Sequence, residues 1–319
     1  MGNNYINLGA KWNNTIDLIS EQYQGVVLGH SGGADSTALF HVLYEVTKRK
    51  KNFSLSLYHM NFGLRGKQSE LDELFSRDLA ARFGVPFHCD KITSEERELR
   101  NSESLQEWAR RLRYQVFENW VKKKWLVALA HHQGDVAENV LIRLSRGSSV
   151  GSLAGMEPLK GGYWRPLLHT KKAALLQYLE KIGENHRVDA SNDKIDYSRN
   201  LIRHNIIPEL NSLYQGCEER IARTGIEGQE ISNWCRSKLS DDLKHLNKEQ
   251  TLTYLKTLPR GVCFEALGEL INKDGVHRQL NRSLLGDIWQ HIQSGSENIP
   301  MSVKIQRKTN LGIMNSKQP

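Results

Sequence analysis

The chain has 319 residues, of which 39% are hydrophobic and 25% are charged, and its formal net charge is +8 at pH 7. These proportions exclude an intrinsically disordered chain, and no apolar run reaches membrane-spanning length. The excess of basic residues favours a polyanionic partner such as nucleic acid, although many basic proteins bind none.

An apolar run followed by a glycine turn is the strongest signal in the chain. Val26–Leu28 is typical of a buried strand, Gly32 and Gly33 follow it, and a helix is predicted to begin just after Asp35. This arrangement makes an anion site, because glycines let the backbone approach a phosphate and a helix N-terminus favours negative charge. The Asp35 carboxylate is suited to a magnesium ion. The turn has neither Walker nor dinucleotide-binding spacing, and the alternative is an ordinary tight turn.

Strands and helices are predicted to alternate through the first half of the chain. We predict strands at residues 53–59, 87–89 and 125–130, and helices at 69–83, at 104–124 and from about 135 onward. This order predicts an α/β fold, with a parallel sheet covered by helices on both faces. Ligands of such sheets lie at the carboxyl ends of the strands. Polar clusters follow three strands, at residues 31–36, 59–65 and 131–138, so we expect them to form one site.

The second half of the chain changes character near residue 210. The pattern continues with an extended segment at 164–168, a helix at 170–181, a polar loop at 189–200, a helix at 201–210, helices at 216–245, 262–273 and 281–294, and a hairpin at 303–314. Beyond residue 211 no regular strand–helix alternation remains. We therefore expect a nucleotide-binding catalytic domain at residues 1–210 and a smaller, mainly helical domain at residues 211–319.

The cysteines exclude several kinds of site. Cys89, Cys217, Cys235 and Cys263 are too far apart for a Cys-x-x-Cys metal or redox motif. We therefore expect reduced thiols in a cytoplasmic protein, with no signal peptide and no membrane partner.

Six further segments match one protein family in order along the chain. They read HMNFGLR at 59–65, ARRLRY at 109–114, AHHQGDVAE at 130–138, RGSSVG at 146–151, DASND at 189–193 and RNLIR at 199–203. Together with the glycine turn, this series resembles the tRNA(Ile)-lysidine synthetases, which are PP-loop ATP pyrophosphatases, over about residues 20–210. The chain looks like a short form with a single C-terminal domain.

The resemblance implies a Rossmann-like fold and a two-step reaction. ATP would adenylate the C2 oxygen of the wobble cytidine of tRNA(Ile) with a CAU anticodon, releasing pyrophosphate. Free L-lysine would then attack C2 and displace AMP, which leaves lysidine. The implied cofactors are ATP and Mg²⁺, the C-terminal domain would contact the tRNA, and the family is compatible with a homodimer.

The resemblance also implies roles for particular residues. The phosphates of ATP would be bound by the turn, that is by Ser31, Gly32, Gly33, Ala34, Asp35 and Ser36. Asp35 would hold the metal and would act in catalysis with Asp135 and Arg199. Asp135 and Glu138, three residues apart at a helix start, would bind lysine, and one of them would accept its proton. The alternative is that these two carboxylates only cap a helix.

Contacts to tRNA or to the adenylate are implied for a set of basic residues. The set is His59, Arg65, Arg113, His132, Arg199 and Arg203. Arg199 and Arg203 lie four residues apart, on one helical face, and paired guanidinium groups suit phosphate. The alternative for this pair is surface salt bridges to acids such as Asp193 and Asp196.

The chain departs from the family pattern at four positions. Phe62 replaces a histidine, Gly134 replaces the first of two adjacent aspartates, Asn139 replaces a threonine and Ser149 replaces a glycine. The glycine turn is intact, so these changes bear on the amine site rather than on the phosphate site.

Two other functions remain open from the sequence. A tRNA thiolase of the same superfamily would adenylate a similar base oxygen and deliver sulfur, for which Cys89 is a candidate. A non-catalytic RNA-binding relative is the second alternative, and Phe62 and Gly134 favour it while the intact turn opposes it.

Overall fold

The computed structural model describes residues 13–93, 95–96, 103–187, 197–273 and 282–294. The hairpin predicted at 303–314 and most of the polar loop predicted at 189–200 lie outside these residues. No helix within the described ranges is both long and apolar enough to cross a membrane.

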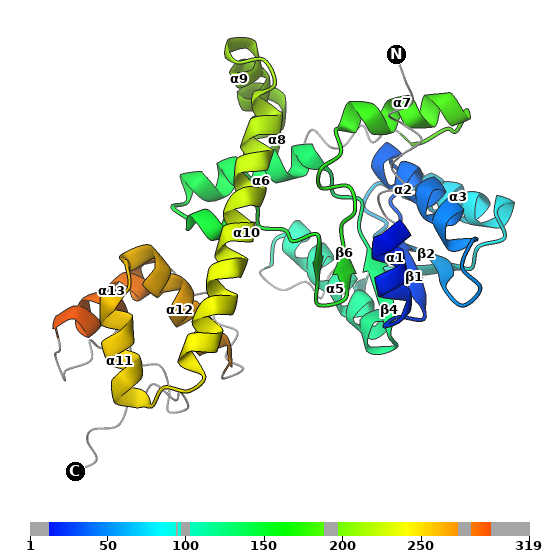
Figure 1. Cartoon of the computed structure of the whole chain (residues 1–319). Coiled ribbons are helices and arrows are strands. Elements are labelled where there is room, and N and C mark those ends of the chain that lie inside the picture. Colours follow the sequence, from blue (N-terminus) through cyan, green and yellow to red (C-terminus); the bar gives the residue numbers. More distant parts are fainter. Residues whose placement is uncertain (1–12, 94, 97–102, 188–196, 274–281, 295–319) are drawn as a thin grey trace. The chain divides into compact units, whose positions relative to one another are not determined.

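A six-stranded sheet forms the centre of the first half of the chain, in the order β3-β2-β1-β4-β6-β5 (Figure 1). Its strands are β1 (Gly25–Gly29), β2 (Ser54–Asn61), β3 (Phe87–Lys91), β4 (Trp125–Ala128), β5 (Leu159–Lys160) and β6 (Tyr163–Trp164). Strands β1, β2, β3, β4 and β6 pair in parallel, as predicted.

One strand at the edge of the sheet departs from the predicted parallel arrangement. Strand β5 pairs antiparallel with β6. The turn between them is Gly161-Gly162, and both glycines have positive φ, the backbone that a tight hairpin requires. The extended segment predicted at 164–168 also ends earlier, because only Trp164 belongs to a strand and Pro166 has no N–H for a sheet.

Side chains that alternate along β1 explain why helices cover both faces of the sheet. Val26 and Leu28 join a core with residues of α2 (Ala34–Thr47), α3 (Lys67–Arg82) and α7 (Lys172–Ile182). Val27 faces the other way and packs with Phe117 of α5 (Leu105–Lys122). The predicted two-sided cover of the sheet is therefore confirmed.

The remaining helices complete the described chain. They are α1 (Asn13–Ser20), α6 (Gln133–Ser145), a 3₁₀ turn (Val150–Ser152), α8 (Tyr197–Leu201), a π-helical turn (Ile202–Ile206), α9 (Ile207–Leu213), α10 (Cys217–Leu243), α11 (Lys248–Thr257), α12 (Arg260–Lys273) and α13 (Arg282–Ser294). The sequence did not predict α11, which begins at a capping box formed by Asn247 and Gln250. The helical character expected after residue 211 is confirmed.

Contacts divide the chain into two compact units. The first comprises residues up to 138 together with 156–222, and the second comprises 139–155 together with residues from 223 onward. In the second unit, α10, α11, α12 and α13 enclose an apolar core that includes Leu255 and Leu267. The domain division at residue 210 stays a prediction.

Candidate active site

Three neighbouring strands bring the three polar clusters to one edge of the sheet. Strand β1 lies between β2 and β4, and both pair with it in parallel. The carboxyl ends of these strands therefore point the same way, toward the segments at 31–36, 59–65 and 131–138. Their expected convergence on one edge of the sheet is confirmed.

The glycine turn links β1 to α2 with an open helix N-terminus. Gly32 has φ of +85°, which a glycine adopts readily, and Gly33 is the N-cap residue of α2. Ser36 Oγ donates to the carbonyl of Gly33 at 3.0 Å and lies 3.2 Å from Ser31 Oγ. Gly33 has no side chain to cap α2, so no capping side chain competes with an anion for the first amides of the helix.

A buried histidine ties the turn to α3. Ser76 Oγ donates to the carbonyl of Asp72 at 2.8 Å, so His30 Nδ1, also 2.8 Å from Ser76 Oγ, is the donor in their contact. Burial lowers the pKa of His30 to about 3, so the imidazole is neutral at physiological pH. His59 Nδ1 donates to the carbonyl of His30 at 2.9 Å. His59, predicted to contact tRNA or the adenylate, is therefore bonded to the residue just before the turn.

Arg187 is a residue of this site that the sequence did not reveal. Its backbone N–H donates to the carbonyl of Gly32 at 2.9 Å, and its Nε donates to Asp72 Oδ1 at 3.0 Å. Arg65, predicted to contact tRNA or the adenylate, donates to the other oxygen of Asp72 at 2.6 Å. Two guanidinium groups therefore share one buried carboxylate beside the turn. The pairing spans 115 residues, a separation for which the sequence carries no local signal.

Replacing Gly32 by alanine should lower both stability and ATP binding. A Cβ at Gly32 would stand 3.2 Å from Arg187 Cγ on a backbone with positive φ, so both strain and contact oppose it. We expect a loss of about 1–3 kcal/mol in unfolding free energy, measured by denaturant titration. Gly66→Ala is the matched control, since Gly66 has φ of +52° and nothing within 4 Å. Equal effects of both variants on ATP affinity would contradict a specific role for the turn.

Asp35 has an unsatisfied oxygen, which suits a cation. Its Oδ1 is buried and has no hydrogen-bond partner among the described residues. Its Oδ2 lies 3.7 Å from His132 Nε2 and 3.8 Å from Lys172 Nζ, a residue that sequence reasoning had not assigned to the site. No group of three or more potential ligating side chains occurs in the described part of the chain. Asp35 therefore fits a magnesium ion whose other ligands are phosphate and water oxygens, as this ion prefers.

Asp135 and Glu138 pair with the two arginines four residues apart. Arg199 donates to Glu138 at 2.6 Å and to Asp135 at 3.0 Å, and Arg203 Nη2 donates to Glu138 at 3.0 Å. The Glu138 side chain is 3% exposed, whereas the two arginines are each about 30% exposed. The structure thus brings together predicted lysine-binding and predicted phosphate-binding residues. Asp193 and Asp196, the alternative partners of these arginines, lie outside the described residues.

Charges around Asp135 keep it ionised. Burial opposes ionisation, but the neighbouring His132, His131 and Arg199 outweigh it and hold the pKa of Asp135 below its ordinary value. Its Oδ2 also accepts a hydrogen bond from the backbone N–H of His132 at 2.9 Å. Asp135 is therefore a weak base and a strong partner for a cation.

His132 lies between the two carboxylates of the site. Its Nδ1 accepts from the N–H of Gly134 at 3.0 Å, so the neutral ring carries its proton on Nε2. That Nε2 is 3.7 Å from Asp35 and 3.8 Å from Asp135. Burial lowers the pKa of the adjoining His131 to about 4, so that ring is neutral at physiological pH.

Gly134 occupies a position with no room for a side chain. A Cβ there would stand 2.8 Å from both His132 Cε1 and Glu218 Oε1. The glycine that replaces the family's aspartate at this position therefore fits the close approach of His132 and Glu218.

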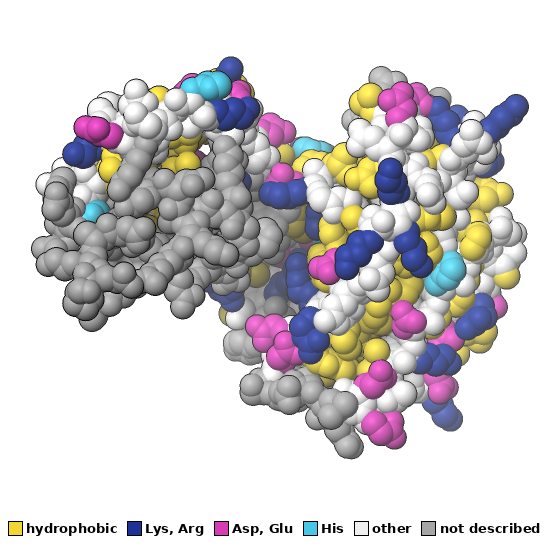
Figure 2. All heavy atoms as spheres, turned by 90° about the horizontal axis from the view of Figure 1, so that it is seen from below, with side chains coloured by type: hydrophobic (Ala, Val, Ile, Leu, Met, Phe, Trp, Pro, Cys, Tyr) yellow, Lys and Arg dark blue, Asp and Glu magenta, His cyan; other side chains and the backbone are white. Residues whose placement is uncertain are grey.

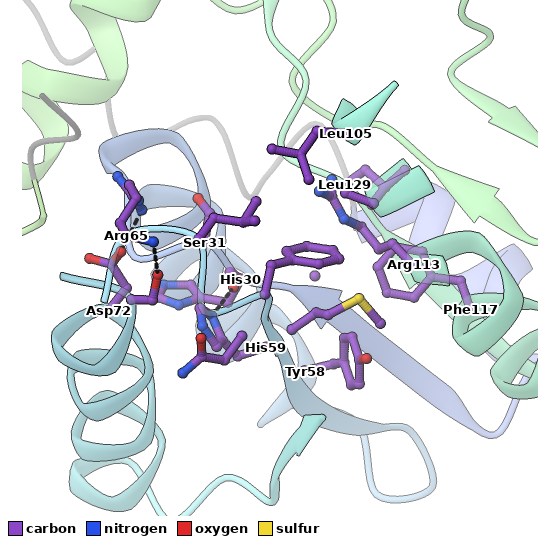
Figure 3. A pocket seen from close by; sticks show the side chains of 17 residues that line it. His30, Ser31, Tyr58, His59, Arg65, Asp72, Leu105, Arg113, Phe117 and Leu129 are labelled. Atoms are coloured by element: carbon purple, nitrogen blue, oxygen red, sulfur yellow. Dashed lines mark hydrogen bonds and ion pairs between the residues drawn. The ribbon is translucent and has the colours of Figure 1, made fainter. Parts of the chain in front are cut away.

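A pocket of about 380 Å³ adjoins the glycine turn. It is lined by Ser31 of the turn, by residues of β2 and the segment after it, and by residues of α5. Figure 3 shows Arg113 and Phe117 on one side of the pocket and Arg65 and Asp72 on the other. The volume and the mainly apolar wall are typical of a small-molecule site.

The surface charge is mixed. On the face that Figure 2 presents, Lys and Arg side chains are interspersed with Asp and Glu. The net charge of +8 is therefore not gathered into one basic field on that face.

Comparisons with known proteins identify the family of the chain. A family model described as a PP-loop domain matches residues 7–210. The tRNA(Ile)-lysidine synthase of Bacteroides thetaiotaomicron is 32% identical over 249 residues, which are 77% of this chain and 51% of that protein. The one of Geobacter sulfurreducens is 38% identical over 207 residues, which are 62% of this chain and 43% of that protein. The chain thus spans about half the length of these curated relatives.

A solved structure is similar in fold alone. The U34-tRNA thiolase NcsA of Methanococcus maripaludis superposes with a TM-score of 0.58 at 18% sequence identity. The superposition covers 71% of this chain and 79% of the thiolase.

Proposed function

The chain belongs to the PP-loop family, and from this membership we propose that it ligates lysine to the wobble cytidine of tRNA(Ile) at the expense of ATP. The observation that carries the proposal is the open glycine turn with the unsatisfied Asp35 oxygen beside it. The named relatives, at 32% and 38% identity, support tRNA(Ile) as the substrate. We further propose the CAU anticodon, free L-lysine as the amine and the cytoplasm as the location.

The first step would use the turn and the pocket beside it. The amides at the start of α2 and the hydroxyls of Ser31 and Ser36 would bind the phosphates, with the nucleoside in the adjoining pocket. The C2 oxygen of cytidine would attack the α-phosphorus as the bond to pyrophosphate breaks. A magnesium ion held by Asp35 would supply positive charge against the leaving pyrophosphate. Lys172, 3.8 Å from Asp35, would add a second cation.

The second step would use the charged cluster of α6 and the segment after α8. Lysine nitrogen would attack C2, the bond from C2 to the adenylate oxygen would break with release of AMP, and the amine would lose its proton to water. The depressed pKa of Asp135 suits it to hold the ammonium rather than to accept that proton. Because Arg199 and Arg203 already pair with both carboxylates, lysine would have to share them with the guanidinium groups.

The thiolase alternative has less support than the ligase. Burial raises the pKa of Cys89 to about 11, so this thiol is a poor source of the thiolate that sulfur transfer requires. The likeness to the solved thiolase, at 18% identity, concerns the fold.

Incorporation of labelled lysine tests the proposed function. The chain, ATP, magnesium, isotopically labelled lysine and tRNA(Ile) with a CAU anticodon are mixed, and label in the purified tRNA is counted. We expect ATP-dependent incorporation, at most one lysine per tRNA, with release of AMP. A tRNA whose wobble cytidine is replaced by uridine is the control. Exchange of pyrophosphate into ATP without lysine in the tRNA would contradict lysine as the amine. If neither exchange nor incorporation occurs, the result favours the alternative of a non-catalytic RNA-binding relative.

A further inference from the structure

Arg113 carries a positive charge that no carboxylate of the described residues pairs with. It comes from α5 and lines the pocket beside the glycine turn, where its exposed surface faces the pocket (Figure 3). Burial by the surrounding protein, aided by the nearby Arg110, lowers the pKa of its guanidinium. The Arg113 side chain is nevertheless exposed, so its charge is available to an anion that enters the pocket.

The guanidinium rests instead on an aromatic ring. Arg113 Cζ lies 5.7 Å from the centre of the Phe62 ring, which is the range of an attractive cation–π contact. Phe62 follows the end of β2, and Trp108 of α5 lies beside it with ring centres 6.2 Å apart. The Phe62 ring thus packs against α5 at both Trp108 and Arg113.

An aromatic ring beside a guanidinium leaves its N–H donors and its charge available to a ligand, whereas a carboxylate does not. A carboxylate would consume two N–H donors of the guanidinium and would cancel its charge. A phenyl ring contacts the face of the guanidinium and leaves its in-plane donors free for phosphate oxygens.

We propose that Phe62 is a positioning residue that orients Arg113 toward a phosphate of the nucleotide bound in this pocket. The identity of the ligand as ATP rests on the proposed function, whereas the coupling between Phe62 and Arg113 is a property of the pocket alone. This gives a role to a residue at which the chain departs from the family pattern, where histidine is usual.

Binding of ATP and of adenosine, each measured by calorimetry without tRNA or lysine, tests the proposal. Phe62→Leu should weaken ATP binding about fivefold or more, the usual scale of a cation–π contact, and should leave adenosine binding within about twofold. Phe62→Tyr keeps an aromatic face and should bind ATP like the unaltered chain. In an Arg113→Ala background, Phe62→Leu should have no further effect on ATP, as coupled residues require.

The pH dependence of ATP binding by Phe62→His is a second test, because a purely structural role of Phe62 would not change it. A histidine with its ordinary pKa of about 6.5 would be neutral at pH 8 and protonated at pH 5.5, where it would repel Arg113. ATP affinity of this variant should therefore change between pH 8 and pH 5.5 more strongly than that of Phe62→Tyr, which has no group that titrates in this range.

Two results would overturn the role of Phe62. One is an equal loss of ATP and adenosine affinity in Phe62→Leu, which would make the ring an ordinary part of the pocket wall. The other is that Phe62→Leu loses neither ATP affinity nor adenosine affinity. Thermal melting of each variant separates these results from misfolding. Because the measurements involve no lysine and no tRNA, a chain that binds ATP as expected yet makes no lysidine would refute the proposed function alone.

Discussion

Asp35→Ala is expected to reduce ATP–pyrophosphate exchange by a factor on the order of 1,000, because metal-assisted charge stabilisation contributes several kcal/mol to such reactions. The substitution removes a buried oxygen that has no partner in the described structure. It also leaves His132 and Lys172 without the carboxylate they face at 3.7 and 3.8 Å. We therefore expect ATP binding to persist while turnover is lost. Exchange of labelled pyrophosphate into ATP, with tRNA present, measures the effect.

Asp78→Ala is the matched control for Asp35→Ala. Asp78 is an exposed carboxylate on α3, and its loss should leave exchange within about twofold. tRNA binding, followed by filter retention, should be similar in both variants. Full exchange activity in Asp35→Ala would refute its assignment as the metal ligand.

Glu138→Gln is expected to raise the KM for lysine about tenfold or more while the KM for ATP changes by less than about threefold, since losing a charged partner costs about 1.5–3 kcal/mol. Glu138 is 3% exposed and pairs with both Arg199 and Arg203. Glutamine keeps the shape of the side chain but removes the negative charge that both guanidinium groups meet at Glu138. Those cations would then repel an incoming ammonium. Initial rates of lysine incorporation at varied lysine and varied ATP separate the two constants.

Glu219→Gln provides a control of the same chemistry at the surface. Glu219 pairs with Lys171 at 2.6 Å, and both side chains are well exposed, so its charge should matter little. Thermal melting of Glu138→Gln, which we expect to be somewhat less stable, shows whether the variant remains folded. Equal increases in both KM values would count against an amine-binding role for Glu138.

Local patterns made the phosphate turn predictable from the sequence. The strand, glycines and helix start lie within residues 25–47, so short-range sterics and capping determine them. The Gly161-Gly162 hairpin also had a local signal, because adjacent glycines favour a two-residue turn. Sequence reasoning passed over that signal in favour of a uniformly parallel sheet.

Contacts between distant segments were not predictable. The pairing of Arg187 with Asp72 joins residues 115 apart, and that of Arg199 with Glu138 joins residues 61 apart. Composition and helical spacing showed that Arg199 and Arg203 share a face, but not which acids they meet. The fold, which follows from periodic burial, was therefore easier to anticipate than the charge pairing within the site.

The crowding at Gly134 limits which residues this position can accept while its neighbours stay in place. Gly134→Asp, a change toward the family pattern, would force apart His132 and the carboxylate of Glu218, which each stand 2.8 Å from the new Cβ. A second acid at this position therefore requires the His132 ring, which faces Asp35, and the Glu218 side chain to move.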